Sequence, residues 1–260
     1  MLSQPVFRFP IGRFERFGRR LYCGALRGIG FNKHVIRSQG ARFIVDTTDM
    51  IDHAVAIDGI WDGDQLEALA AVCRQRPVDV FFDIGANSGI YSVLVAKKRL
   101  ASEVVAFEPD PGNFARLNAN LALNGLAGTV RALPFAVGDC AAEVSLTEAG
   151  AYNRGESWIS HPDLPDQPVD GPKHKVRQIR FDDEFALAGK TLVIKMDVEG
   201  YEFQALAGMR RTLRDNACYL QVELYSDRLE ELKDLFTGMD YRYVYTWGID
   251  HYFTNISTDA

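Results

Sequence analysis

The sequence predicts an α/β protein with a mostly parallel sheet and helices on both of its faces. Short apolar runs alternate with helical patterns from about residue 76 onward, which is typical of repeated strand–helix units. A glycine-rich bend at residues 83–89 follows the first apolar run and precedes a helical pattern. The chain has 260 residues, 47% of them hydrophobic, which suits one α/β domain with an extra N-terminal piece.

Residues 1–75 are predicted to form a helical N-terminal extension, acting as a lid or docking element, ahead of a main domain over residues 76–260. Its helical pattern is carried by Phe14, Phe17, Leu21 and Ala25. We expect this helix to be broken early by Gly24, Gly28 and Gly30. One interpretation is an amphipathic helix packed on the main domain. The other is a basic helix at a membrane surface or against an anionic substrate, since nine Lys or Arg residues precede Asp46 against one acid.

Residues 41–45 and 54–57 are predicted to form a pair of short strands or a lid. A helix over residues 65–73 follows, with Asp64 as its N-cap, because a carboxylate there can accept a hydrogen bond from the first free amides. Its apolar face consists of Leu66, Leu69, Ala70 and Cys73.

The main domain is predicted to alternate strands and helices. Strands are expected at residues 78–82, 104–107, 130–137, 143–147, 191–196 and 219–224. Helices are expected at residues 90–96, 114–123, 203–213 and 229–236. Residues 241–245 and 251–254 are predicted to form a closing hairpin. The stretch at 149–174 is rich in Gly, Pro and Asp, and its length indicates a functional loop or an insertion.

Acidic residues follow nearly every predicted strand. One such acid commonly caps a helix or faces water. Because parallel strands place their carboxyl ends at one edge of the sheet, acids after most of them predict an acidic crevice at that edge. These acids are Asp83, Glu108, Asp139, Asp197, Glu199 and Glu223.

The bend at residues 83–89 indicates what this crevice binds. Gly85 and Gly89 carry no bulky side chain, so a ligand can approach the backbone and the first amides of the helix. Glu108 lies about 20 residues further on, where a carboxylate suits the two hydroxyls of an adenosine ribose. A nicotinamide dinucleotide would want the third glycine of a GxGxxG fingerprint, which is missing here, and an acidic crevice repels a pyrophosphate. S-adenosylmethionine, with a sulfonium and an ammonium, fits better.

Three blocks of the sequence resemble the signatures of FkbM-type methyltransferases. They are DIGANSGIYS at residues 83–92, AFEPDP at 106–111 and KMDVEG at 195–200, with a weaker block, AVGD, at 136–139. The resemblance covers roughly residues 41–225. It implies a class I methyltransferase fold, a Rossmann-like sandwich with an antiparallel last strand. It also implies O-methyl transfer from S-adenosylmethionine to a hydroxyl of a sugar, glycan or secondary metabolite.

Six residues are candidates for the cofactor site. Gly85, Asn87 and Gly89 would shape the turn under the methionine portion. Asp83 would face the cofactor's ammonium, directly or through water, and Glu108 would hold the ribose. Asp139 is a candidate for the adenine amino group, and a turn role for it is equally open.

Four residues are candidates for the chemistry. Lys195, Asp197 and Glu199 alternate at a strand end, so they point to one side. They form either a structural lysine–carboxylate pair or a catalytic site. In the catalytic site, Asp197 or Glu199 takes the proton of the acceptor hydroxyl while the methyl group transfers in line. Glu223, at the end of the next strand, is the alternative base or acceptor-binding carboxylate. The same acids could hold a divalent metal, although no metal site is assigned.

Composition supplies the remaining expectations. The net charge of −6 gives no global argument for nucleic acid, and a small-molecule or glycan acceptor is expected instead. The four cysteines are far apart and form no CxxC motif, which favours a reduced, cytoplasmic location. The sequence shows neither a run of about 18 apolar residues nor a signal peptide, so only peripheral membrane contact through the basic N-terminus is expected. Two rival functions are a nicotinamide-dependent oxidoreductase or epimerase, and a non-catalytic module with the methyltransferase fold.

Overall fold

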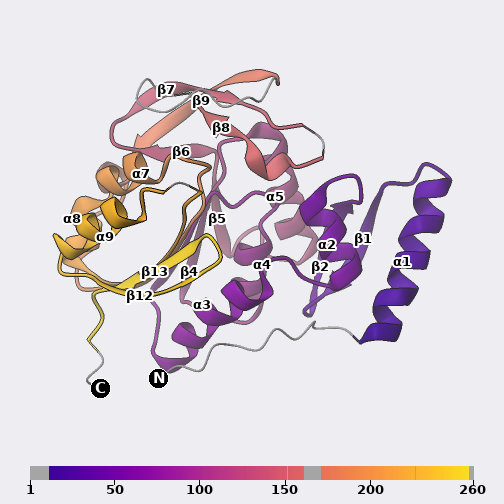
Figure 1. The fold of residues 1–260 in the computed structure, drawn as a ribbon, viewed down its shortest axis with the longest axis horizontal. Helices are drawn as coiled ribbons and strands as arrows, with labels where there is room; N and C mark the ends of the chain where they lie inside the picture. Colours follow the sequence, from indigo (N-terminus) through magenta and orange to yellow (C-terminus); the bar gives the residue numbers. More distant parts are fainter. Residues whose placement is uncertain (1–11, 151, 161–170, 226, 258–260) are drawn as a thin grey trace.

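A seven-stranded sheet forms the centre of the computed structural model, which describes residues 12–150, 152–160, 171–225 and 227–257 (Figure 1). Its strand order is β5-β4-β3-β10-β11-β13-β12. Strand β13 pairs antiparallel with β11 and β12, whereas the other neighbours from β5 to β11 pair in parallel. The predicted class I methyltransferase arrangement is therefore confirmed. The strands are β3 (Val80–Ile84), β4 (Glu103–Phe107), β5 (Val130–Leu133), β10 (Thr191–Met196), β11 (Ala217–Glu223), β12 (Arg242–Trp247) and β13 (Asp250–Thr254).

Both faces of this sheet are buried, which explains why its central strands read as continuous apolar runs. In β3, Phe81 belongs to one apolar cluster, while Phe82 and Ile84 belong to a second cluster on the opposite face. Helices α3 (Gly63–Gln75), α4 (Ile90–Lys97) and α5 (Pro111–Leu123) contribute to the first cluster. The second takes residues from α6 (Phe181–Glu184), α7 (Glu202–Gly208), α8 (Arg210–Asp215) and α9 (Leu229–Thr237).

A separate four-stranded sheet lies beside the carboxyl edge of the main one. Its order is β6-β9-β7-β8, and it carries the short helix η1 in a connecting segment (Figure 1). The single strand expected at residues 130–137 is thus wrong. Its first half is β5, and its second half pairs with β9 after Pro134, which has no amide hydrogen with which to continue a ladder. The elements are β6 (Phe135–Gly138), β7 (Ala142–Thr147), η1 (Arg154–Glu156), β8 (Trp158–Ile159) and β9 (Lys173–Arg180).

The described part of the N-terminal extension consists of α1 (Arg13–Gly28), the hairpin β1 (Lys33–Ser38) and β2 (Ala41–Asp46), and α2 (Met50–Asp58), followed by α3. Residues 54–57, expected to be a strand or lid, lie inside α2, which Asp49 caps by accepting from the amide of Asp52. Asp64 is not the N-cap of α3, because that helix starts two residues earlier than predicted and Asp62 occupies the N-cap position. Phe43 and Val45 of β2 join the same apolar cluster as Leu117 of α5, so the extension shares the core of the main domain.

Helix α1 continues through Gly24 and ends at Gly28, so the early break expected at Gly24 is wrong. It packs against α2, but not through its apolar face. Phe14 is 94% exposed, Phe17 62% and Leu21 60%. The interpretation that this apolar face packs on the main domain is therefore wrong. No helix in the described ranges is long and apolar enough to cross a membrane.

Candidate active site

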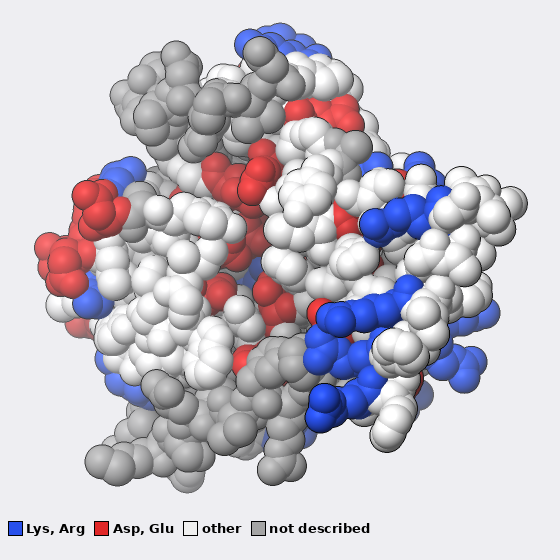
Figure 2. Space-filling view, turned by 45° about the vertical axis from the view of Figure 1, so that its right-hand side comes forward, with Lys and Arg blue, Asp and Glu red and all other residues white. Residues whose placement is uncertain are grey.

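One cavity opens at the carboxyl ends of the central strands. Figure 2 shows a hollow on this face with acidic side chains gathered inside it. It is lined at one end by the glycine bend and the residues after β4, and at the other by the residues after β10 and β11. Parallel strands place their carboxyl ends together, so this is where the sequence predicted the acidic crevice. Of the ten predicted site residues, those that line the cavity are Gly85, Asn87, Glu108, Asp197, Glu199 and Glu223.

The glycine bend lets the chain pass under this cavity. Two features exclude a side chain at Gly85. Its φ of +80° is unfavourable for other residues, and a Cβ there would overlap the carbonyl oxygen of Asp197. Gly89 has φ +82° and precedes α4, where a Cβ would overlap Leu117. It does not line the cavity. The two glycines therefore differ: Gly85 joins two functional strand ends, and Gly89 permits close packing of α4 on α5.

Glu108 is held in the cavity wall by two backbone amides. Its two oxygens accept from Asn87 N at 2.7 Å and from Asp110 N at 2.8 Å. The carboxylate has four lone-pair directions, so each oxygen can still accept from a ligand hydroxyl. Burial raises the pKa of Glu108 to about 8, although the two amides act against that rise. Asn87 has φ +49°, a left-handed conformation that turns its amide toward Glu108.

Besides Gly89, two predicted cofactor residues lie off the cavity lining. Asp83 is 1% exposed, and its Oδ2 accepts from the amide and hydroxyl of Ser92 at 3.0 and 2.6 Å. Any contact from Asp83 to a ligand ammonium would therefore run through water, which was one of the predicted alternatives. Asp139 is exposed in the turn between β6 and β7, outside the main sheet. That position agrees with a turn role and places Asp139 outside the edge on which the prediction had grouped it.

Lys195 connects the two halves of the cavity. Its Nζ donates to Asp197 Oδ2 at 2.9 Å and to the carbonyl oxygen of Gly85 at 3.0 Å. The lysine is 5% exposed. Burial lowers the pKa of Lys195, but the charges of Asp197 and Asp83 outweigh it, so the net shift is upward and the ammonium is retained.

Three carboxylates meet beside this ammonium. Asp197, Glu199 and Glu223 have oxygen atoms within 4.8 Å of one another. Burial and the charge of Asp197 raise the pKa of Glu199 to about 9 and that of Glu223 to about 8. Glu199 has φ +53°, and this left-handed turn follows directly from β10. One buried lysine does not neutralise three carboxylates, so the cluster holds a proton or attracts a cation.

The cluster has the donor chemistry of a divalent-metal site, since oxygen ligands suit Mg²⁺ and Ca²⁺. Lys195 donates to Asp197 Oδ2, so an ion at the cluster would share that carboxylate with the ammonium. The geometry is thus equally that of a site for an organic cation, and we assign no metal.

Several residues of the cavity were missed as site residues from the sequence. Asp62, Gln65 and Asp250 line the half beyond the three carboxylates, together with the indoles of Trp61 and Trp247. Gln65 Nε2 donates to Asp250 Oδ2 at 3.2 Å. Burial and the charge of Asp250 raise the pKa of Asp62 to about 7. The Trp61-Asp62-Gly63-Asp64 run was visible, but it was interpreted only as a helix start. The closing hairpin that brings Asp250 in was predicted, but nothing in its local pattern shows that it packs beside α3.

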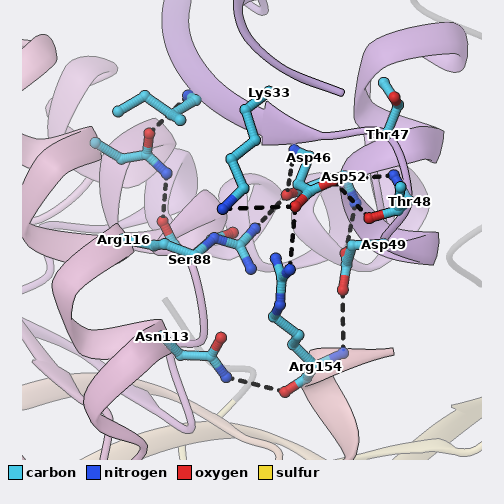
Figure 3. Close-up of polar contacts among 12 residues, drawn as sticks. Lys33, Asp46, Thr47, Thr48, Asp49, Asp52, Ser88, Asn113, Arg116 and Arg154 are labelled. Carbon is cyan, nitrogen blue, oxygen red and sulfur yellow. Dashed lines mark hydrogen bonds and ion pairs between the residues drawn. The ribbon is translucent and has the colours of Figure 1, made fainter. Parts of the chain in front are cut away.

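The N-terminal extension also supports one wall of the cavity, because its Asp46 and Asp49 bind Arg154 of η1. Its guanidinium donates to Asp46 Oδ2 at 3.0 Å, and its amide donates to Asp49 Oδ2 at 3.0 Å (Figure 3). Its carbonyl oxygen accepts from Asn113 Nδ2 of α5 at 2.9 Å. The neighbouring residues Asn153 and Gly155 line the cavity. Three elements far apart in sequence thus fix this short segment beside Glu108.

Charge pairing stabilises this junction. Burial acts to raise the pKa of Asp46, but hydrogen bonds from Thr48 and Arg154 outweigh it and bring that pKa down to about 2. Asp52 is buried beside Arg116 of α5, with which it forms an ion pair. Its carboxylate also accepts from the amide of Asp46 at 2.8 Å.

The long loop predicted to be functional contributes to the cavity through residues 153–159, while residues 161–170 lie outside the described ranges.

Comparison with known proteins gives the arrangement a family. The model of the methyltransferase FkbM domain matches residues 83–243. A hexuronic acid methyltransferase, AglP of Haloferax volcanii, is 28% identical over 150 residues, covering 57% of this chain and 56% of the relative. The 31-O-demethyl-FK506 methyltransferase FkbM of Streptomyces tacrolimicus is 30% identical over 160 residues, covering 52% of this chain and 60% of the relative. The chain thus spans a little over half the length of these two relatives.

A solved structure is also similar. The crystal structure of a methyltransferase FkbM from Methylobacillus flagellatus has a TM-score of 0.47 and 17% sequence identity, covering 77% of this chain and 65% of that one.

Proposed function

The chain belongs to the FkbM methyltransferase family, and from that premise we propose that it transfers a methyl group from S-adenosylmethionine to a hydroxyl of a carbohydrate acceptor. One observation carries the proposal. A single cavity joins the glycine bend and Glu108 to the carboxylate cluster and to a second polar half with aromatic walls. A cofactor and an acceptor can therefore meet in it.

The residues present fit S-adenosylmethionine. Gly85 opens the floor to the backbone, and Glu108 offers free lone pairs to a ribose. The apolar side chains of Phe107 and Val137 line the same end and suit the faces of an adenine ring. The excess of negative charge in the cavity favours the cationic cofactor over a dinucleotide pyrophosphate. Such a cofactor supplies an electrophilic methyl group on a positively charged sulfur.

The acceptor half has the character of a sugar site. Trp61 and Trp247 offer flat apolar surfaces, which can pack against the C–H face of a pyranose ring. Asp62, Gln65 and Asp250 offer acceptors and a donor to neighbouring hydroxyls. AglP is named for a hexuronic acid, but the carboxyls at this end would repel an acidic sugar. We therefore propose a neutral sugar, free or within a glycan, in preference to a uronic acid.

The carboxylate cluster would manage the acceptor proton. A neutral alcohol is a poor nucleophile, so a positioned base raises its reactivity by about 10²–10⁴-fold. Asp197 is oriented by Lys195, while Glu199 and Glu223 have raised pKa values. The sulfonium of a bound cofactor would favour their charged forms, which can accept a proton. In this proposal Glu199 or Glu223 takes the hydroxyl proton, and the Lys195–Asp197 pair fixes the strand end beside the methyl group.

Calorimetric titration of the full chain tests the cofactor assignment. We expect S-adenosylmethionine and S-adenosylhomocysteine to bind and NADH not to bind. Glu108→Ala should weaken S-adenosylhomocysteine binding at least tenfold. Binding of NADH, or no binding of either S-adenosyl compound by folded protein, would refute the proposal.

Transfer of a labelled methyl group to a panel of acceptors tests the chemistry. Neutral methyl glycosides should be methylated faster than matched uronic acids, and an apolar alcohol should be the slowest. Glu199→Gln and Glu223→Gln should both retain S-adenosylhomocysteine affinity within a few-fold, and the one that removes the base should lose at least 100-fold in kcat, the scale of a lost acid–base group. Faster turnover of the uronic acid would contradict the neutral-sugar assignment alone.

A further inference from the structure

Helix α1 carries its apolar side chains on the face that points away from the protein. Phe14, Phe17 and Leu21 recur at three- and four-residue spacing and so share one face of the helix. They are exposed by 94, 62 and 60%. Tyr22 is also exposed, outside this stripe, and its ring makes an edge-on contact with His34 of β1. Four of the large exposed hydrophobic side chains in the described part of the chain therefore lie on one helix of 16 residues.

The opposite face of α1 holds the helix in this orientation through polar contacts. Arg16 pairs with Asp58 of α2 at 2.6 Å. Arg19 donates to the carbonyl oxygens of Ala56 at 3.3 Å and Arg37 at 3.0 Å. Cys23 is the buried residue of the helix. Arg16 and Arg19 thus attach the helix to the rest of the protein, although arginines on a surface helix normally face water. The apolar face formed by Phe14, Phe17 and Leu21 is left exposed among the described residues.

Positive charge borders this apolar face. Arg13, Arg20 and Arg27 follow one another at seven-residue spacing along one edge of the helix, and all three are exposed. The one acid of the helix, Glu15, is paired with Arg19 at 3.0 Å. Figure 2 shows Lys and Arg side chains gathered on the side where α1 lies, on the same face as the acidic hollow. An apolar face bordered by arginines is the pattern of a helix lying in an anionic membrane interface.

We propose that α1 docks this protein on the surface of an anionic lipid bilayer, with Phe14, Phe17 and Leu21 inserted among the lipid chains and Arg13 and Arg20 beside the headgroups. The charge pattern favours this occupant over a second copy of the chain. In an antiparallel twofold pairing of α1 through the same patch, the two arginine edges would lie on the same side and repel. An anionic bilayer complements both the apolar face and its charged edge.

Vesicle co-sedimentation of the full chain tests the proposal. We expect binding to vesicles of equal parts phosphatidylcholine and phosphatidylglycerol, little binding to phosphatidylcholine alone, and weaker binding as salt is raised. The double variant Phe14→Ser/Phe17→Ser should lose at least tenfold in partitioning. Arg13→Gln/Arg20→Gln should lose less, and its remaining binding should depend less on salt.

Matched variants elsewhere control for general loss of apolar surface or charge. Tyr152→Ser removes an exposed aromatic side chain outside α1, and Lys173→Gln/Lys175→Gln removes two exposed cations on β9. Both should bind vesicles like the unmodified chain. Every α1 variant should retain its affinity for S-adenosylhomocysteine, because α1 does not line the cavity. That readout separates a failure of this proposal from a failure of the proposed function.

Three outcomes would overturn the membrane proposal. The unmodified chain could fail to sediment with anionic vesicles. The Phe14→Ser/Phe17→Ser variant could bind as well as the unmodified chain. Velocity sedimentation without lipid could show a dimer that this variant converts to a monomer, which would assign the face to self-association.

Discussion

Lys195 Nζ lies 2.9 Å from Asp197 Oδ2 and 3.0 Å from the carbonyl oxygen of Gly85. The same carbonyl-bearing bend passes so close to Asp197 that only glycine fits at position 85. One ammonium therefore ties the cofactor bend to the strand end that carries the chemistry. This relationship makes the two signature blocks, about 110 residues apart, one structural unit.

Removing that ammonium should affect stability and catalysis together. Lys195→Met leaves Asp197 beside Glu199 and Glu223 without a cation, and breaking a buried pair costs roughly 3–5 kcal/mol. We expect a lower urea midpoint, weaker S-adenosylhomocysteine binding and at least a 100-fold loss of kcat. Lys190→Met removes an exposed lysine 3.5 Å from Asp79 near the start of the same strand and should change little. Equal effects of the two variants would contradict the role given to Lys195.

A methyl group at position 85 should be far more damaging than one at another left-handed glycine. Gly85→Ala forces a Cβ onto the carbonyl oxygen of Asp197, whereas Gly125→Ala at φ +70° meets open space. The second change costs only the left-handed conformation, about 1–2 kcal/mol. Urea denaturation and S-adenosylhomocysteine titration should show a larger loss of stability and of binding for Gly85→Ala. Similar losses would mean that backbone strain, and not the close approach to Asp197, decides the glycine.

Arg154→Met should loosen the wall of the cavity without touching the cofactor directly. The substitution removes the ion pair with Asp46 and leaves that carboxylate with Thr48 and a distant Lys33 at 3.8 Å. We expect the dissociation constant for S-adenosylhomocysteine to rise about fivefold, or roughly 1 kcal/mol. Asp46→Asn should give a similar rise, and the double variant little more, because both changes break one interaction. Arg214→Met, beside Asp215 on the surface, is the control. Additive effects would show that Arg154 does not act through Asp46.

Binding of S-adenosylmethionine should become tighter as pH rises, and binding of S-adenosylhomocysteine should not. The pKa values of Glu223 and Glu199 are raised to about 8 and 9, so both are mainly protonated at pH 7 in the free protein. A nearby sulfonium favours their charged forms, so its binding releases protons and gains from higher pH up to about 9. The gain is at most about tenfold per pH unit for each proton released. S-adenosylhomocysteine lacks that charge and serves as the matched ligand.

Calorimetry in buffers of different ionisation enthalpy measures the released protons. Glu199→Gln should reduce both the number released and the slope of affinity with pH. Parallel pH profiles for the two ligands would contradict the placement of the sulfonium beside this cluster.

The fold could be predicted largely because its signals are local. Buried parallel strands read as apolar runs, glycine marks the bend at residue 85, and acids stand where strands end. The errors in the fold arose where a single residue overrides a local apolar pattern. Pro134 divides one predicted strand between two sheets, and Asp139 leaves the crevice as a result. The expected strand at residues 54–57 belongs to a helix that Asp49 caps.

The cofactor half of the site was more visible in the sequence than the acceptor half. Gly85 and Glu108 lie in short blocks whose spacing along consecutive strands fixes their meeting. Asp62 and Asp250 are 188 residues apart in the sequence. They line the same cavity only because the closing hairpin packs beside the start of α3. Arg154 likewise reaches Asp46 from a loop with no regular pattern.

The sequence by itself determined that parallel strands end in acids around a glycine bend, because period, spacing and residue type act over a few positions. It also determined that Phe14, Phe17 and Leu21 share a helix face. Only the tertiary structure decided that this face points outward, because the anchors are Asp58 and two backbone carbonyls from other elements. Periodicity shows which side chains lie together on a helix, and only the packing of the rest of the chain decides which face is buried.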